Sequence, residues 1–195
     1  MRIFFTSLFA ILLYVPVWGQ KLLSAKQIRL LDSIATQDVP KNAPGIATAI
    51  IKNGKVIYEK YAGYADLLDS TFIKNNTRFN IASNGKQFTA LAILQLVDEK
   101  KLSLKDDIRK WFPNLYPNVK ERIPVQSLLN HTSGIRDCYD LWALQGYTWW
   151  EKSFDNTDVL TLIEKQVDLN CKPNTQYLYS NTNYILLALL VEKVS

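Results

Sequence analysis

The chain is poor in the side chains that bind metals most often, with one histidine and two cysteines among its 195 residues. Structural zinc sites need about four nitrogen or sulfur ligands, so we expect no metal site and no bound cofactor. Cys138 and Cys171 lie far apart in the sequence. They could pair in an oxidising compartment or remain free thiols, and their spacing alone leaves both readings open.

The sequence also has only a small excess of positive charge. The sequence has 23 lysines and arginines against 18 acidic residues, a net charge of +5, and its basic residues are dispersed. Nucleic-acid binding requires a basic patch or stripe, so we do not expect that class of partner. The length and the 48% of hydrophobic residues suit one ordinary domain with a real core.

One long apolar run, over residues 3–18, follows the basic Arg2. It is short for a membrane span, and small residues lead up to Gly19, so residues 1–19 are predicted to be a signal peptide. No cysteine lies near the cleavage site, which argues against a lipid anchor. We therefore expect an exported protein, periplasmic or secreted, with no stable membrane anchor after cleavage.

Local patterns predict several elements. Ser24 and Gln27 form the pattern of a capping box, which opens a helix through Ile34. Two β-rich runs flank Asn53-Gly54, a dipeptide typical of a tight hairpin turn. Further short helices are predicted over 105–111, over VQSLLN after Pro124, and from 156 to 167. The aromatic stretch 137–154 is predicted to be a long loop that lines a cleft or covers the core.

The rest of the chain is predicted to be organised around residues 79–99, FNIASNGKQFTALAILQLVDE. This stretch enters a helix that is apolar around most of its circumference and is therefore predicted to be buried on most sides. Ser83 and Lys86 stand three residues apart at its start, so they share one helical face. A serine needs a neighbouring base to become a nucleophile, and an uncharged lysine amine can be that base. Alone, the pair would more often be a helix-capping serine beside a solvated lysine.

A second set of polar residues, Tyr179-Ser180-Asn181, precedes the apolar segment TNYILLALLVEKVS. A tyrosine beside a lysine can accept a proton and return it to a leaving group, while an asparagine can orient the lysine. The alternative is a purely structural role, with a buried tyrosine beside a helix-capping asparagine. His131, the only histidine, lies in His-Thr-Ser-Gly at 131–134, and any Ser-His-Asp hydrolase would have to use it.

Taken in order, FNIASNGKQFTALAILQLVDEKKLSLKDDIRKWFP, IPVQSLLNHTSGI and YLYSNTNYILLALLVEKVS resemble the serine β-lactamase and penicillin-binding-protein-like family, in its class C and esterase-like branch. The resemblance covers residues from about 45 to the last. It implies an α+β, β-lactamase/transpeptidase-like fold with an antiparallel sheet flanked by helices. It also implies that Ser83, Lys86, Tyr179 and Asn181 are catalytic. One small departure is Asn174, which stands where the family often has glycine.

A larger departure is the absence of the family's third motif, a Lys-Thr-Gly or His-x-Gly on a later strand. The Lys-Asn-Gly at 52–54 belongs to the hairpin turn and does not replace it. We therefore expect the chain to be the N-terminal portion of a longer enzyme, with the C-terminal strands of the sheet missing. The expected organisation is a helix and linker over 20–44 and an incomplete hydrolase domain over 45–195.

The function that the resemblance implies is a serine hydrolase that works through an acyl-enzyme. Its substrate would be a small molecule or a peptidoglycan-derived peptide: a β-lactam, a D-alanyl peptide or an ester. One alternative is a catalytically silent peptide- or wall-binding protein on the same scaffold. Another is a hydrolase with His131 as its base. The sequence does not choose among the substrates, and it does not indicate an oligomeric state.

Overall fold

The structure is a computed structural model that describes residues 23–40, 42–148 and 151–195. The chain divides into two compact units, one ending at Phe79 and one from Asn80 to Ser195. The predicted signal peptide lies outside the described residues, as do Trp149 and Trp150 of the aromatic stretch. Among the described residues, no helix is long and apolar enough to cross a membrane.

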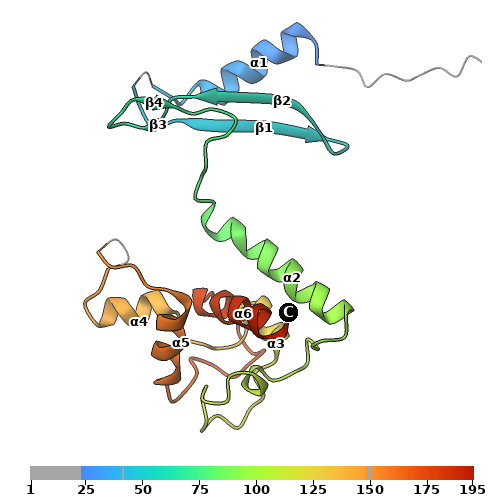
Figure 1. Cartoon of the computed structure of the whole chain (residues 1–195), viewed down its shortest axis with the longest axis vertical. Helices are drawn as coiled ribbons and strands as arrows, with labels where there is room; N and C mark the ends of the chain where they lie inside the picture. The colour runs from blue at the N-terminus through green and yellow to red at the C-terminus, as the bar shows by residue number, and fades with distance from the viewer. Residues whose placement is uncertain (1–22, 41, 149–150) are drawn as a thin grey trace, which may run out of the picture. The chain divides into compact units, whose positions relative to one another are not determined.

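The described residues of the first unit form one helix and two small antiparallel sheets (Figure 1). Its elements are α1 (Ala25–Thr36), β1 (Ile46–Lys52), β2 (Lys55–Ala62), β3 (Tyr64–Asp66) and β4 (Thr71–Phe72). The predicted capping box of α1 is confirmed, because Ser24 and the side chain of Gln27 bond to each other's backbone N–H groups. The predicted hairpin is confirmed as well. Asn53 and Gly54 both have positive φ, 50° and 72°, as a tight turn between twisted strands requires.

The second unit is mainly helical. Its elements are η1 (Ala82–Gly85), α2 (Lys86–Asp98), η2 (Ile108–Lys110), α3 (Val125–Leu129), α4 (Cys138–Leu144), α5 (Asn156–Glu164) and α6 (Asn181–Val194). Helix α6 packs against α2, α3, α4 and α5 and so forms the centre of this unit (Figure 1). Three of its leucines, Leu186, Leu187 and Leu190, are fully buried. The apolar segment at the end of the sequence is thus the core on which the unit's other helices pack.

Three predictions about elements were wrong, and two short strands were not predicted. Residues 105–111 form only the short turn η2, and α5 ends at Glu164, before the predicted residue 167. The aromatic stretch contains a helix, α4, which Asp137 caps by accepting from the Tyr139 N–H. Strands β3 and β4 were missed because they are too short to show an alternating pattern.

The prediction that the helix after Ser83 is buried on most sides was also wrong. Only Ile93 and Leu96 of α2 are buried, whereas Phe88 and Leu91 are 62% and 54% exposed. An apolar circumference shows that a helix can be buried, but a packing partner is needed on each side. Of the two readings of the cysteines, the structure has the free thiols: Cys138 is buried, Cys171 is partly buried, and the two are not bonded.

Candidate active site

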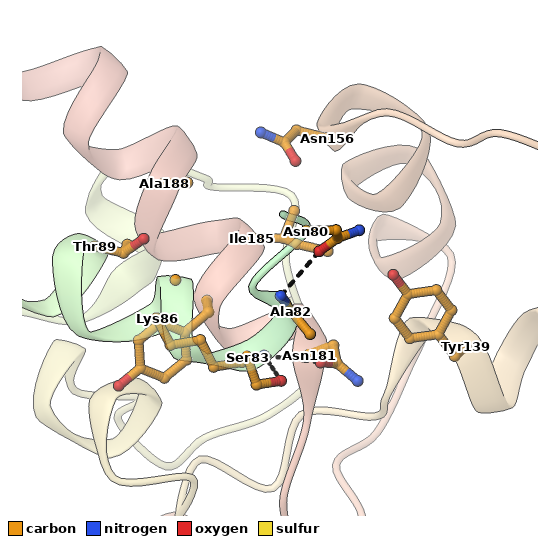
Figure 2. A pocket seen from close by; sticks show the side chains of 12 residues that line it. Asn80, Ala82, Ser83, Lys86, Thr89, Tyr139, Asn156, Asn181, Ile185 and Ala188 are labelled. Atoms are coloured by element: carbon orange, nitrogen blue, oxygen red, sulfur yellow. Dashed lines mark hydrogen bonds between the residues drawn. The ribbon is translucent and has the colours of Figure 1, made fainter. Parts of the chain in front are cut away.

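Ser83 lies in the tight turn η1, immediately before α2. The preceding residue, Ala82, has a φ of +46°, a left-handed conformation that costs free energy for any residue with a Cβ. The side chain of Asn80 stabilises this turn by accepting from the Ala82 N–H at 2.9 Å (Figure 2). One turn later, the ammonium of Lys86 donates to Ser83 Oγ at 3.0 Å. The predicted sharing of a face by Ser83 and Lys86 is therefore observed.

Tyr179 and Asn181 complete a hydrogen-bonded cluster at the start of α6. The Tyr179 hydroxyl lies 2.8 Å from Ser83 Oγ, and the Lys86 ammonium donates to Asn181 Oδ1 at 3.0 Å. The Tyr179 hydroxyl also donates to Asn181 Oδ1, at 3.3 Å. Two segments that lie nearly a hundred residues apart in the sequence thus bring all four predicted site residues together.

Asp137 is a member of this cluster that sequence reasoning missed. Its Oδ2 accepts from both the backbone N–H and the side-chain Nδ2 of Asn181, the latter at 2.9 Å. With its amide nitrogen held by Asp137, Asn181 must turn its carbonyl oxygen toward Lys86. The side chain is 9% exposed, so water competes little for these bonds. An aspartate before a helix reads in the sequence as a capping residue, which it also is; its contact with Asn181 depends on the tertiary fold.

His131 supports Tyr179 and does not reach Ser83. Its ring stacks on the Tyr179 ring, with centroids 4.4 Å apart and planes 27° apart. Its Nδ1 accepts from the Ser180 N–H at 3.2 Å, which places the ring proton on Nε2. Burial, and next the charge of Lys86, lower the pKa of His131, so the ring is neutral near neutral pH. Among the described contacts of His131, none involves Ser83, which leaves the alternative with His131 as base without geometric support.

Residues 131–134 hold the segment that leads to Tyr179. The carbonyls of His131, Thr132 and Gly134 each accept at 2.8 Å, from the N–H groups of residues 178, 174 and 170 respectively. We call these three bonds the carbonyl ladder. Gly134 has a φ of +75°, and a Cβ there would lie 2.1 Å from the Cys171 carbonyl oxygen, so only glycine fits.

Asn174, where the family often has glycine, has a φ of +63°. Asparagine is one of the few residues that adopt this left-handed conformation readily. Its Oδ1 also accepts from the Thr132 hydroxyl at 3.1 Å, which adds a bond that glycine lacks. The departure from the family pattern therefore preserves the backbone conformation.

The cluster perturbs the pKa of Tyr179. Burial alone would raise this pKa, but the side chains of Lys86 and Ser83 and the positive charge of Lys86 outweigh it, so the pKa is lowered below the usual value of 10.0. The phenolate form is thus more accessible than in an isolated tyrosine. At a given pH, more of Tyr179 is therefore in the phenolate form, which is the form that can accept a proton.

A cavity of about 580 Å³ opens over the cluster. Ser83, Lys86 and Asn181 lie in its wall, with Thr89 on one side and Tyr139 on the other (Figure 2). This volume is in the range of pockets that hold small molecules. Within the ranges that the structure describes, no three side chains are grouped as metal ligands.

Comparison with known proteins places this geometry in a family. The Beta-lactamase family matches residues 31–195. A curated relative, Protein flp of Staphylococcus aureus, is 37% identical over 169 residues, which cover 85% of this chain and 33% of the relative. The chain thus spans about a third of the length of this relative.

Comparison with solved structures supports the same family. The octameric penicillin-binding protein homologue from Pyrococcus abyssi has a TM-score of 0.67 and 30% identity, covering 88% of this chain and 39% of that one. The D-amino acid amidase from Ochrobactrum anthropi SV3 has a TM-score of 0.66 and 25% identity, covering 85% and 44%. The fold is β-lactamase/transpeptidase-like, and the chain belongs to the β-lactamase family of serine hydrolases.

Proposed function

We propose that Ser83 is the nucleophile of a hydrolase that cleaves an ester or amide through an acyl-enzyme. One observation carries this proposal: Ser83 Oγ lies 2.8 Å from the Tyr179 hydroxyl while it accepts from Lys86 at 3.0 Å. Because Lys86 donates to this oxygen, the serine's own proton is free to point at Tyr179. The lowered pKa of Tyr179 supports this proposal because it makes the phenolate, the form that can accept this proton, more populated.

In the first half of the reaction, Ser83 Oγ attacks the carbonyl carbon and its proton passes to the Tyr179 phenolate. The carbonyl oxygen gains the negative charge, and the Ser83 N–H, in the turn η1 before α2, is the proposed donor to it. When the tetrahedral intermediate collapses, Tyr179 gives its proton to the leaving alcohol or amine. The acyl group then remains on Ser83.

In the second half, a water attacks the acyl carbon and loses a proton to Tyr179, which returns it to Ser83 Oγ as the acid leaves. The positive charge of Lys86 stabilises the phenolate. Asn181, with its oxygen on Lys86 and its nitrogen on Asp137, holds the ammonium at that place. The residues therefore supply a nucleophile, one proton carrier and one fixed cation.

For the substrate, we propose a small molecule or a peptidoglycan-derived peptide: a β-lactam, a D-alanyl peptide or an ester. Support comes from relatives whose names include a penicillin-binding protein homologue and a D-amino acid amidase. We further propose that the protein acts after export, since such peptides lie outside the cytoplasm. Cell fractionation, with sequencing of the mature N-terminus, tests the export.

The central experiment incubates the full chain with a fluorophosphonate and with a labelled penicillin, and follows the intact mass. We expect an adduct on Ser83 from at least one reagent and none in Ser83→Ala. A folded protein that neither reagent labels would contradict the proposal and favour a silent binder of wall peptides. Circular dichroism of both proteins establishes that they are folded.

A second experiment tests the roles of Lys86 and Tyr179. Replacing Lys86 by Met removes the cation that lowers the Tyr179 pKa, so the pKa rises. The labelling rate increases with pH as Tyr179 ionises; this increase should move to higher pH in Lys86→Met. An unchanged pH profile would show that Tyr179 is not the proton acceptor.

A further inference from the structure

A second cavity lies next to the first and shares part of its wall. It has a volume of about 390 Å³. Tyr139, Asn156 and Ile185 line both cavities. Figure 2 shows Tyr139 and Asn156 on the opposite side of the first cavity from Lys86 and Thr89. A molecule whose carbonyl lies at Ser83 can therefore extend past these shared residues into the second cavity.

The inner wall of this second cavity is aromatic and rigid. The rings of Trp142 and Phe154 stack with centroids 3.6 Å apart and planes 15° apart. Tyr139 meets Trp142 edge to face at 6.0 Å. Trp142 is 6% exposed and Val159 is 2% exposed, so the wall is fixed by the core behind it. Such walls favour planar apolar groups, which stack offset or edge to face on the rings.

The polar residues of the cavity have other contacts that hold them at its edge. The Lys152 ammonium lies 4.9 Å from the centre of the Phe154 ring and 5.0 Å from that of Tyr147. Asp155 uses its carboxylate to cap α5, accepting from two backbone N–H groups at 2.8 and 2.9 Å. These polar groups lie beside the aromatic rings, so the cavity offers both polar and apolar surface to a ligand.

We infer that the second cavity is a subsite for an aromatic group of the substrate, and that it selects aryl esters or amides over small aliphatic ones. The inference rests on the proposed function only for the position of the carbonyl at Ser83. Removing a phenyl-sized group from water favours binding by about 10- to 150-fold, which sets the size of the preference.

The kinetic test uses three thioesters on the full chain: the methyl thioester of acetic acid, the methyl thioester of phenylacetic acid and the benzyl thioester of acetic acid. The second compound carries a phenyl ring on the acyl side, and the third carries it on the leaving-group side. We expect kcat/KM to be at least about 10-fold higher for one of them than for the methyl thioester of acetic acid. Equal values for all three would overturn the inference and leave the proposed function intact.

Ser153→Trp fills the second cavity from an exposed position in its wall, so the fold should tolerate it. The preference should disappear, while hydrolysis of the small thioester is unchanged. Ser103→Trp is the matched control, because this exposed serine lines neither of the two cavities. A preference that survives in Ser153→Trp would place the aryl group elsewhere.

A binding measurement separates the two hypotheses if no thioester is hydrolysed. Calorimetry of Ser83→Ala with the methyl thioester of phenylacetic acid should show binding that Ser153→Trp weakens about 10-fold and Ser103→Trp does not. Binding without turnover would retain the subsite and reject the proposed chemistry. Absence of both would reject the subsite as well.

Discussion

The two halves of the candidate site lie at the starts of α2 and α6, and the two helices differ in how deeply they are buried. Both are apolar around most of their circumference. Helix α6 buries Leu186, Leu187 and Leu190 completely, whereas α2 leaves Leu91 and Leu94 about half exposed. The Tyr179–Asn181 half is therefore fixed by a core, and the Ser83–Lys86 half by a local turn. Composition alone does not distinguish the two cases.

The largest expected effect comes from Tyr179, in the segment that leads into α6. Tyr179→Phe removes the proposed proton carrier but keeps the ring on His131. The rate of Ser83 labelling should fall by ~100- to 10,000-fold, the range for loss of a general acid–base. The matched control is Tyr177→Phe, two residues earlier and exposed, which should label at the parent rate. Equal rates in both variants would remove Tyr179 from the mechanism.

The contrast in burial predicts a contrast in stability. Leu187→Ala leaves a cavity in the centre of the second unit and should cost ~2–5 kcal/mol of unfolding free energy. Leu91→Ala removes a 54% exposed side chain and should change it by less than about 0.5 kcal/mol. Urea unfolding of the two variants measures both. A cost at Leu91 that approaches that at Leu187 would show that α2 is buried in solution.

Asp137 links the two halves through Asn181. Asp137 uses one carboxylate oxygen for Asn181 and the other for the cap of α4. Asp137→Asn leaves one acceptor oxygen for both, and its new NH2 group points at one of these two donors. We expect Asn181 to lose its orientation and the labelling rate to fall roughly 10- to 100-fold, as for a misplaced catalytic group. Asp140→Asn, in the same helix, is the control and should have little effect. A normal rate in Asp137→Asn would show that Asn181 is positioned without the carboxylate.

The smallest effect concerns His131 and pH. Its folded-state pKa is lowered from 6.5, so the unfolded chain binds a proton more readily. The stability that it contributes is complete above pH 6.5 and is lost as pH falls through the lower folded pKa. The melting temperature should therefore drop less between pH 7.5 and pH 5 in His131→Gln than in the parent. An identical drop in both proteins would show that His131 is not the group responsible.

Sequence patterns were sufficient for the local features. The capping box at Ser24, the Asn53-Gly54 turn and the proximity of Ser83 to Lys86 depend on residues within one turn of each other. The fold could be anticipated because three motifs occur in the order that the family has. The meeting of Tyr179 with Ser83 could be anticipated only from that resemblance, since no local rule joins segments so distant.

What the sequence did not predict depends on tertiary contacts. Asp137 has the local pattern of a helix cap, and only the folded structure shows that its second oxygen reaches Asn181. The exposure of Leu91 depends on which faces of α2 meet a partner. The stacking of Trp142 on Phe154 joins residues on either side of a stretch that had no regular pattern.

The carbonyl ladder has a consequence for protein engineering. Because residues 131–134 bind residues 170–178 directly, the position of Tyr179 does not depend on the chain that connects α4 to α5. The exposed residues 151–153 of that connection can therefore be varied, as antibody loops are varied on a constant framework. Such a library would diversify the wall of the second cavity at Lys152 and Ser153 while Ser83 and Tyr179 keep their geometry.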